Sequence, residues 1–333
     1  VTANIPVPLY NEENDVPDFP GAYGIMGWSE ADSVMYVYDR YDIWRVSPTS
    51  GFAPRLLSLT LQPDKQPLTG RARKVVTRFI STDREQRFFE AGKNYLFSVF
   101  DDVTKESGLY FSAVEGHLSR SYINFSSRVS PARYAVSRNG NSFVCSFESY
   151  TACPDLYFTS LLPQSRKINF DASGHFEYYS YPEALRLSDI NPQQKEYNWG
   201  TASLFRWKAY DGKQAAGILY KPEDYDPAKK YPLICYFYEQ LTDGLYNYIP
   251  PAPTPSRLNI PFFVGRGYLV LAPDIIYQNG HPGNSAYNYV VSGARALVKA
   301  GMADSTRIGI QGQSWGGYQV VQLITRTHLF KAA

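Results

Sequence analysis

Ser314 stands between two glycines in the run Gly312-Gln313-Ser314-Trp315-Gly316. The Gly-x-Ser-x-Gly pattern is typical of a nucleophile elbow, a sharp strand-to-helix turn that lifts a serine hydroxyl above a sheet. The turn strains the backbone at the serine, and side chains at the two glycine positions would collide where strand and helix pass closely. A serine presented in this way can attack a carbonyl carbon and form an acyl intermediate. The run therefore predicts a nucleophile at Ser314.

The residues on either side of this run have the patterns of a strand and a helix. Residues 307–311 are predicted to form a short buried strand, and residues 318–327 a helix that buries Val321, Leu323 and Ile324. A bare Gly-x-Ser-x-Gly recurs by chance. The order strand, turn, helix is the context that the motif requires, so it favours the elbow over a plain glycine turn.

The stretch before the run alternates strands with helices. A hairpin is predicted over residues 203–220, and apolar strands over 233–238 and 268–272, with a short helix near 258–264 between them. One apolar face then marks a helix that ends at Gly301; it consists of Val290, Val291, Ala294, Leu297 and Val298. This alternation predicts an α/β domain with a parallel sheet over residues 199–333.

Residues 1–198 have the composition and pattern of antiparallel β-structure. Aromatic residues make up 16% of the chain, with 28 tyrosines, which favours strands. A two-part unit recurs, in which an aromatic-rich strand is followed by an acidic residue or Gly and then by aliphatic and aromatic residues. Its copies are 34–38 with 42–44, 95–100 with 108–111, and 142–147 with 155–158. The recurrence favours an incomplete β-propeller of three to four blades, with a β-sandwich as the alternative. The polar stretch 167–199 is predicted to connect the two domains.

Composition argues against several classes of partner. The net charge is +2, which gives no broad electrostatic case for nucleic acid or an anionic membrane. The densest basic cluster, residues 71–74, is predicted to be a solvated face. No apolar run reaches the length of a membrane span, because Arg266 and Asp274 interrupt the most apolar stretch.

The three cysteines provide no disulfide framework. Cys145 and Cys153 could pair across a hairpin or stay as thiols, and Cys235 lies in an apolar strand. Their spacing suits no zinc site, and His-Glu-x-x-His does not occur. No metal and no cofactor is expected.

Three segments together resemble the prolyl oligopeptidase and dipeptidyl peptidase family of serine peptidases. They are Gly312-Gln313-Ser314-Trp315-Gly316-Gly317-Tyr318, residues 304–310 and residues 231–238. The resemblance is specific from about residue 203 to 333 and looser over the β-rich part. It implies an α/β-hydrolase domain capped by a β-propeller, with peptides cleaved between the two.

The resemblance also implies roles for individual residues. Ser314 would be the nucleophile, and the backbone N–H of Trp315 and the hydroxyl of Tyr238 would be the two oxyanion donors. Such donors must already point at the place where negative charge develops on the carbonyl oxygen. A packed core tyrosine is the alternative for Tyr238. Tyr318 would line the substrate pocket, with helix packing as its alternative.

The sequence departs from the family pattern at two places. Many relatives have Gly-Gly-Pro after the oxyanion tyrosine, whereas Glu239-Gln240-Leu241 follows Tyr238 here, and relatives often show Asp-x-Arg-Gly where this chain has residues 274–277. Asp274 is therefore expected to be structural. Exopeptidases of the family hold the substrate amine with propeller acids. Here the candidate acids are predicted to be solvated loop or edge residues; they are Glu148 and the Asp101-Asp102 pair.

The histidine and acid of a catalytic triad are not evident in the chain. In α/β-hydrolases the order is Ser, Asp or Glu, then His. The residues after Ser314 contain no Asp or Glu and a single histidine, His328, predicted about 21 Å along the same helix by the helical rise. The other histidines precede the serine; they are His117, His175 and His281. We therefore expect a longer protein that supplies the triad Asp and His beyond residue 333, and no useful peptidase activity from residues 1–333 alone.

The expected function is that of a serine peptidase acting on short peptides. A carboxylesterase is the first alternative, since the same site serves esters. A catalytically silent protein that binds peptides or partners is the second. The resemblance allows a homodimer. Together with the absence of an initiator Met, it favours a periplasmic or extracellular location, with a cytoplasmic one left open.

Overall fold

The computed structural model describes residues 2–16, 18–49, 51–57, 75–80, 88–114, 121–123, 130–137, 142–160 and 184–333. The basic cluster 71–74, His117, His175 and the first part of the predicted connection lie outside these residues. The chain divides into two compact units. Unit 1 comprises Val1–Phe147 and Asp155–Asp189, and unit 2 comprises Glu148–Pro154 and Ile190–Ala333. The predicted boundary at 198–199 lies within unit 2.

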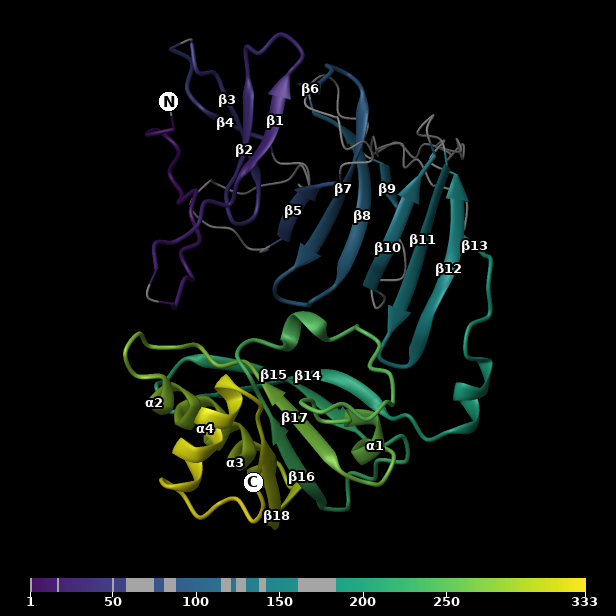
Figure 1. Ribbon diagram of the computed structural model, residues 1–333, viewed down its shortest axis with the longest axis vertical. Helices are drawn as coiled ribbons and strands as arrows, with labels where there is room; N and C mark the ends of the chain where they lie inside the picture. Colours follow the sequence, from purple (N-terminus) through teal and green to yellow (C-terminus); the bar gives the residue numbers. More distant parts are fainter. Residues whose placement is uncertain are drawn as a thin grey trace, which may run out of the picture. The chain divides into compact units, whose positions relative to one another are not determined.

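The described strands of the N-terminal part form three sheets (Figure 1). The first has the order β4-β3-β2-β1-β6, with β1 Ile25–Ser29, β2 Met35–Tyr38, β3 Ile43–Val46, β4 Arg55–Leu57 and β6 Phe88–Phe89. The second has the order β5-β7-β8-β9, with β5 Val75–Phe79, β7 Asn94–Asp101, β8 Ser107–Ala113 and β9 Ser121–Ile123. The third has the order β10-β11-β12-β13, with β10 Ser130–Val136, β11 Ser142–Ser149, β12 Ala152–Ser160 and β13 Leu185–Arg186.

Each copy of the repeated sequence unit supplies two neighbouring strands of its own sheet. The copies correspond to β2 with β3, β7 with β8, and β11 with β12. The β2–β3 and β7–β8 pairs are antiparallel, as expected for strands joined by short turns. The repeat therefore reflects one antiparallel hairpin in each sheet.

A buried carboxylate closes the turn after the first strand of two of these hairpins. Asp39 accepts hydrogen bonds from the backbone N–H groups of Tyr41 and Asp42 at 2.6 and 2.7 Å. Asp101 accepts from the backbone N–H of Val103 at 2.9 Å and is 5% exposed. The prediction that Asp101 is solvated is wrong, because its oxygens satisfy buried turn amides. Each carboxylate thus stabilises its hairpin.

The remaining candidate acids are partly buried. Asp102 pairs with Lys105 at 2.9 Å and with Arg40 at 3.4 Å. Glu148 lies near the end of β11, and partial burial raises the pKa of its carboxyl. Neither is fully solvated, contrary to the prediction.

Unit 2 is built on one mixed sheet of the order β14-β15-β17-β16-β18. The strands are β14 Thr201–Lys208, β15 Gln214–Lys221, β16 Tyr231–Tyr236, β17 Leu269–Pro273 and β18 Ala303–Gln311. β17, β16 and β18 are parallel, and the β14–β15 hairpin adds antiparallel strands at one edge. The helical elements are η1 Pro192–Glu196, η2 Thr242–Gly244, α1 Ile260–Val264, α2 Pro282–Ala286, η3 Tyr287–Val291, α3 Ser292–Lys299 and α4 Trp315–Ile324.

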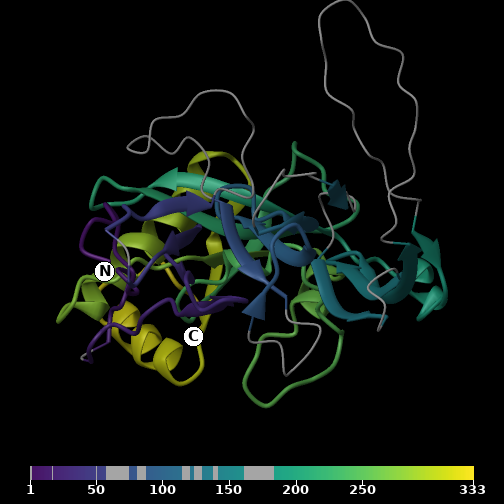
Figure 2. The same cartoon turned by 90° about the horizontal axis from the view of Figure 1, so that it is seen from above.

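Both faces of this sheet are covered (Figure 1; Figure 2 gives the view from above). Leu269 and Leu271 of β17 pack in a cluster with residues of η3, α3 and α4, whereas Val270 and Ala272 pack with Val264 of α1. Alternate residues of one strand thus enter two different cores. This explains why β17 is a continuous apolar run, as expected for a strand of a two-sided α/β sheet.

The helix predicted before the elbow is present, and its apolar face is buried. Val290, Val291, Ala294 and Leu297 have no exposed surface, whereas Val298 is only partly buried and packs at the edge of the same cluster. Gly301, with φ of 76°, ends the helix in the left-handed conformation that glycine adopts easily.

The helix after the elbow differs from its prediction in start and in orientation. It runs over Trp315–Ile324 rather than residues 318–327. Leu323 is fully buried as predicted, but Val321 and Ile324 are 57% and 45% exposed, so the prediction is wrong for both. The reason is that the helix packs on the sheet through Gly316, which lies against the backbone of Phe237, and Gln319, which donates to the backbone O of Tyr238, so its inward stripe consists of residues 316, 319 and 323.

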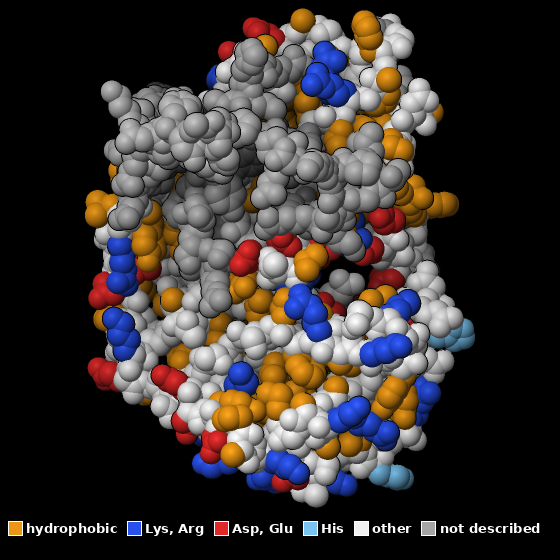
Figure 3. Space-filling view, turned by 180° about the vertical axis from the view of Figure 1, so that it is seen from behind, with side chains coloured by type: hydrophobic (Ala, Val, Ile, Leu, Met, Phe, Trp, Pro, Cys, Tyr) orange, Lys and Arg blue, Asp and Glu red, His pale blue; other side chains and the backbone are white. Residues whose placement is uncertain are grey.

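No helix among the described residues is long and apolar enough to cross a membrane. On the face shown in Figure 3, the charged side chains of the described residues are interspersed with hydrophobic and uncharged ones rather than gathered into one basic surface.

The cysteines are thiols, and no disulfide joins Cys145 to Cys153, both of which the structure describes. Cys145 and Cys235 are buried, and burial raises the pKa of each thiol from 9.0 to about 12. At pH 8 this lowers their thiolate fractions roughly a thousandfold.

We therefore expect at most one of the three cysteines to react with a thiol reagent at pH 8 before unfolding, and all three after denaturation. Spectrophotometric thiol titration with and without guanidinium measures both numbers. Rapid reaction of Cys235 in the native protein, located by peptide mapping, would contradict the buried state of this thiol.

Candidate active site

Ser314 lies at the turn between β18 and α4 with backbone angles of φ 55° and ψ −114°. Residues other than glycine rarely adopt this region, and a strained residue of this kind needs surrounding structure to hold it. The Ser314 side chain is exposed and makes no hydrogen bond to any residue that the structure describes. A strained turn thus presents the hydroxyl at the carboxyl end of a parallel strand.

The two flanking glycines are required by close packing of strand and helix. A Cβ atom at Gly312 would lie 2.4 Å from the backbone O of Gly316, and one at Gly316 would lie 2.5 Å from the backbone O of Phe237. Real Cβ atoms essentially never come so close to backbone atoms. Gly317 is different. A Cβ atom added there would lie 3.6 Å from the nearest atom, the backbone O of Gly312, which is an ordinary van der Waals distance.

Replacing Gly316 with alanine is expected to lower the free energy of unfolding by about 1–3 kcal/mol, because the new methyl group must displace Phe237 or α4. Thermal unfolding measures the effect. Gly317→Ala is the matched control, one residue along the same helix: it is expected to leave stability unchanged or to raise it by about 0.5–1 kcal/mol, since alanine is the better helix former. Equal stability of the two variants would contradict this packing.

Tyr238 lies two residues beyond the last residue of β16. Its side chain is 37% exposed, so the packed-core alternative does not describe it. Its backbone O accepts hydrogen bonds from the Tyr277 hydroxyl at 2.8 Å and from Gln319 Nε2 at 2.9 Å. The Tyr238 hydroxyl has no hydrogen bond to a described residue in the structure, so its place depends on how the backbone is held.

Trp315 and Tyr318 lie on the first turn of α4. The backbone N–H of Trp315, the first residue of the helix, has no acceptor among the described residues. The rings of Trp315 and Tyr318 stack with centroids 5.1 Å apart and an interplanar angle of 16°. Tyr318 is nevertheless 42% exposed, so it both packs on its neighbour and presents a ring surface beside Ser314.

Asp274 fixes the loop that departs from the family pattern. Its carboxylate accepts hydrogen bonds from the backbone N–H groups of Leu241 and Thr242 at 2.6 and 2.9 Å, and also from the Thr242 hydroxyl. The structural role predicted for Asp274 is confirmed. The segment that follows Tyr238 is thus a turn held by a carboxylate.

Two residues next to the site did not emerge from the sequence. Tyr277 and Gln319 contact the backbone of Tyr238, and Gln319 also donates to the Tyr277 hydroxyl at 2.8 Å. A signal for Gln319 existed: it is a polar residue three positions after Gly316, on the inward stripe of the helix. Gln319 could be recognised from this signal only if Gly316 was known to belong to the helix and to face inward.

Neither histidine of the described residues bonds to Ser314. His281 is exposed and lies immediately before α2. His328 is also exposed, and because α4 ends at Ile324 it lies in the following loop, so its predicted place on the helix is wrong. That loop returns to the sheet, where Ala332 forms a parallel bridge with Gly309 of β18. No group of His, Cys, Asp and Glu side chains within the described ranges could hold a metal ion.

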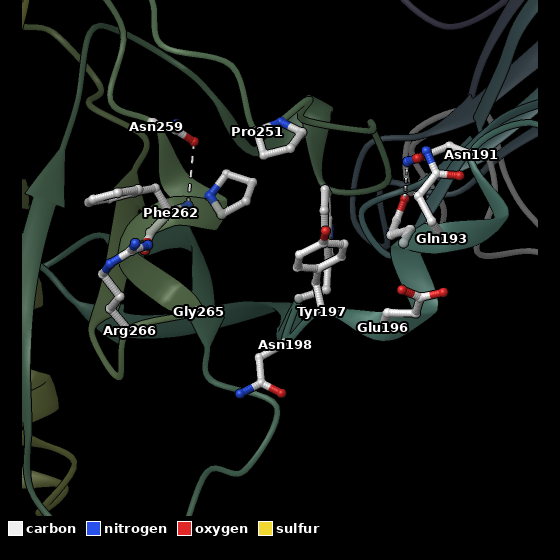
Figure 4. Close-up of a pocket in the computed structure, with 13 residues that line it drawn as sticks. Asn191, Gln193, Glu196, Tyr197, Asn198, Pro251, Asn259, Phe262, Gly265 and Arg266 are labelled. Atoms are coloured by element: carbon white, nitrogen blue, oxygen red, sulfur yellow. Dashed lines mark hydrogen bonds between the residues drawn. The ribbon is translucent and has the colours of Figure 1, made fainter.

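A cavity of about 780 Å³ lies between η1 and α1 in the same unit (Figure 4). Aromatic and polar side chains line it, among them Tyr197, Phe262 and Arg266. Its lining includes neither Ser314 nor Tyr238, and among the described residues around it there is no Ser, Thr, Cys or His. Its described lining therefore supplies no serine, threonine or cysteine nucleophile and no histidine base, and the cavity is separate from the elbow.

Sequence comparison finds a family match and curated relatives for part of the chain. The model of the prolyl oligopeptidase family matches residues 256–333. Dipeptidyl peptidase 8 of Homo sapiens is 29% identical over 143 residues, which cover 39% of this chain and 16% of the relative. A probable chloroplastic glutamyl endopeptidase of Oryza sativa subsp. japonica is 26% identical over 194 residues, covering 52% of this chain and 19% of the relative.

Solved structures resemble nearly the whole chain. The acylaminoacyl peptidase of Pyrococcus horikoshii has a TM-score of 0.53 at 17% identity and covers 96% of this chain and 46% of its own. A putative dipeptidyl aminopeptidase IV from Bacteroides ovatus has a TM-score of 0.57 at 17% identity, with coverages of 92% and 43%. At these identities the likeness shows the fold, which in these peptidases joins a propeller to an α/β-hydrolase domain.

The chain spans less than a fifth of the length of these curated relatives and less than half of the solved chains. Within that span, the matched family segment includes β17, the helices before the elbow, Ser314 and α4. The resemblance predicted from the sequence is confirmed: residues 256–333 match the model of the prolyl oligopeptidase family, and the named relatives and solved structures are peptidases.

Proposed function

We propose that the full-length protein is a serine peptidase that cleaves short peptides through an acyl-enzyme at Ser314. The observation that carries the proposal is the exposed hydroxyl of Ser314 on a strained turn, with φ of 55°, between β18 and α4. The family match over residues 256–333 supports the same reaction class.

In this proposal the Ser314 oxygen attacks the scissile carbonyl carbon, and the carbonyl oxygen becomes an oxyanion. The backbone N–H of Trp315 and the hydroxyl of Tyr238 would donate hydrogen bonds to that oxyanion. Two observations support these roles: the Trp315 N–H has no described acceptor, and the Tyr238 side chain is partly exposed. The exposed ring of Tyr318 would contact the substrate side chains beside Ser314.

A serine is a weak nucleophile without a base. We propose that an Asp and then a His, in the order that α/β-hydrolases use, follow residue 333 in the full-length protein. The absence of a hydrogen bond between Ser314 and either described histidine supports this placement.

The proposal is tested by treating the full-length protein with a fluorophosphonate probe and mapping the labelled residue by mass spectrometry. Covalent labelling at Ser314 is expected, because the probe reacts with activated serines. Absence of labelling at Ser314 in a folded protein would indicate a catalytically silent binding protein. Comparison of peptide and ester substrates then separates a peptidase from an esterase, since only the former turns over the peptide bond efficiently.

A further inference from the structure

A set of hydrogen bonds connects the two residues that carry the proposed oxyanion donors, Tyr238 and Trp315, through Tyr277 and Gln319. Tyr277 Oη donates to the backbone O of Tyr238 at 2.8 Å, and Gln319 Nε2 donates to the same oxygen at 2.9 Å. Trp315 Nε1 and Gln319 Nε2 both donate to Tyr277 Oη, at 3.0 and 2.8 Å. These bonds join the end of β16, the segment after β17 and the first turns of α4.

The chemistry of the groups fixes the direction of every bond in the set. An indole N–H can only donate, so the Tyr277 oxygen must accept from Trp315. The Tyr238 carbonyl can only accept, so it receives the single hydrogen of Tyr277 and one amide hydrogen of Gln319. Turning the Gln319 amide over would place its oxygen against the carbonyl oxygen of Tyr238, which can only accept. The set therefore has one self-consistent arrangement, which makes it stiff.

The composition of the set is not explained by stability alone. Gln319 is fully buried, and its Oε1 has no hydrogen-bond partner among the described residues. A buried acceptor without a partner destabilises a protein, so packing by itself favours an apolar side chain at this position. Departures from such local rules are expected where function requires a particular geometry.

The set holds the backbone of Tyr238 and the indole of Trp315, the two residues whose donors must point at the oxyanion. The Tyr238 hydroxyl has no described partner of its own, so its place follows from its backbone, whose O the set holds. Trp315, whose N–H is the second proposed donor, enters the set through its indole. Displacing a catalytic group by about 1 Å can lower a rate on the order of 10²-fold.

We propose that Tyr277 and Gln319 are positioning residues, which fix the two oxyanion donors relative to each other and to Ser314. The inference rests on the proposed peptidase function. Neither residue needs to touch the substrate: both act through the carbonyl of Tyr238 and the indole of Trp315. The occupants of positions 277 and 319 thus set kcat rather than substrate affinity.

The test uses Tyr277→Phe and Gln319→Met in the full-length protein. Each is expected to lower kcat by about 10–100-fold with KM changed less than about twofold, because an oxyanion exists only in the transition state. Gln319→Met is further expected to leave the unfolding temperature unchanged or higher, since it removes the unsatisfied buried oxygen. A loss of stability with an unchanged kcat in both variants would overturn the inference.

Tyr289→Phe is the matched control. Its hydroxyl donates to Asp211 Oδ2 at 3.0 Å in the same unit but takes no part in this set. Its loss is expected to lower the unfolding temperature without changing kcat. If Tyr277→Phe misfolds, Gln319→Met carries the test, and the reverse also holds.

A double-mutant cycle with Tyr238→Phe distinguishes positioning from an independent effect. In the Tyr238→Phe background, Tyr277→Phe is expected to lower kcat by a smaller factor than in the unmodified protein, because one of the two donors that it positions is already gone and only the Trp315 N–H remains to be displaced. The same fold-change in both backgrounds would overturn the inference while leaving the proposed function standing. Full activity of Ser314→Ala would instead refute the proposed function, and the inference with it.

Discussion

Replacing Ser314 with alanine is expected to lower kcat of the full-length protein on its peptide substrate by roughly 10⁵–10⁶-fold. The reason is that the hydroxyl at this strained turn is the atom proposed to form the acyl-enzyme, and an alanine methyl group cannot form a covalent bond to the substrate. The remaining rate would come from substrate binding and the oxyanion donors alone. Steady-state turnover, with the fluorophosphonate label as a second readout, measures the loss.

Ser305→Ala is the matched control, since Ser305 is an exposed serine on the same strand, β18. It is expected to retain full turnover. A Ser314→Ala variant that keeps turnover comparable to the control would remove Ser314 from the reaction.

The backbone at Ser314 adds a stability readout to the same position. Glycine adopts φ of 55° without the strain that a Cβ imposes. Ser314→Gly is therefore expected to be more stable than Ser314→Ala by about 1 kcal/mol, although both are inactive. Chemical denaturation compares the two, and equal stabilities would show that the turn carries no such strain.

Removing the hydroxyl of Tyr238 by a Tyr238→Phe substitution is expected to lower kcat about 10²–10³-fold, the effect of losing one oxyanion donor. KM is expected to change little, because the donor acts on charge that develops only in the transition state. The ring, its exposure and the backbone hydrogen bonds of this residue are all retained, so stability is expected to be unchanged. The kinetic constants on a peptide substrate measure the effect.

Tyr236→Phe is the control for this substitution. Tyr236 lies two residues earlier, at the end of β16. Its side chain packs with the cluster that contains α1, on the face of the sheet away from α4. Turnover of this variant is expected to equal that of the unmodified protein. A Tyr238→Phe variant that raises KM but keeps kcat would indicate a substrate contact instead of an oxyanion donor.

The short apolar strands and the glycine-flanked serine were predictable because each depends on local physics. A strand buried on both faces must be apolar throughout, which β17 is, and a turn that brings Gly312 against the backbone of Gly316 admits no Cβ at Gly312. For the same reason the repeated unit of the N-terminal part located β2 with β3 and β7 with β8. The apolar face of the helix before Gly301 was correct as well.

The errors concern side chains whose burial is decided by a contact with a distant segment or by a hydrogen bond to the backbone. Val321 and Ile324 are exposed although they are apolar, because contacts of Gly316 with Phe237 and of Gln319 with Tyr238 turn a different face of α4 toward the sheet. Asp101 looked solvated because its partners are turn amides that no side-chain pattern reveals. The burial of a carboxylate depends on such partners and not on its charge.

The sequence by itself determined the local geometry of the elbow: a serine whose neighbours permit a strained turn at the end of a buried strand. Tertiary structure alone decided what surrounds that serine. The carbonyl of Tyr238, the hydroxyl of Tyr277 and the amide of Gln319 come from three separate segments, and they meet only because β16, β17 and α4 are neighbours in the fold. Steric rules act between adjacent residues and are readable in the chain, whereas hydrogen bonds between distant segments exist only after the sheet has been assembled.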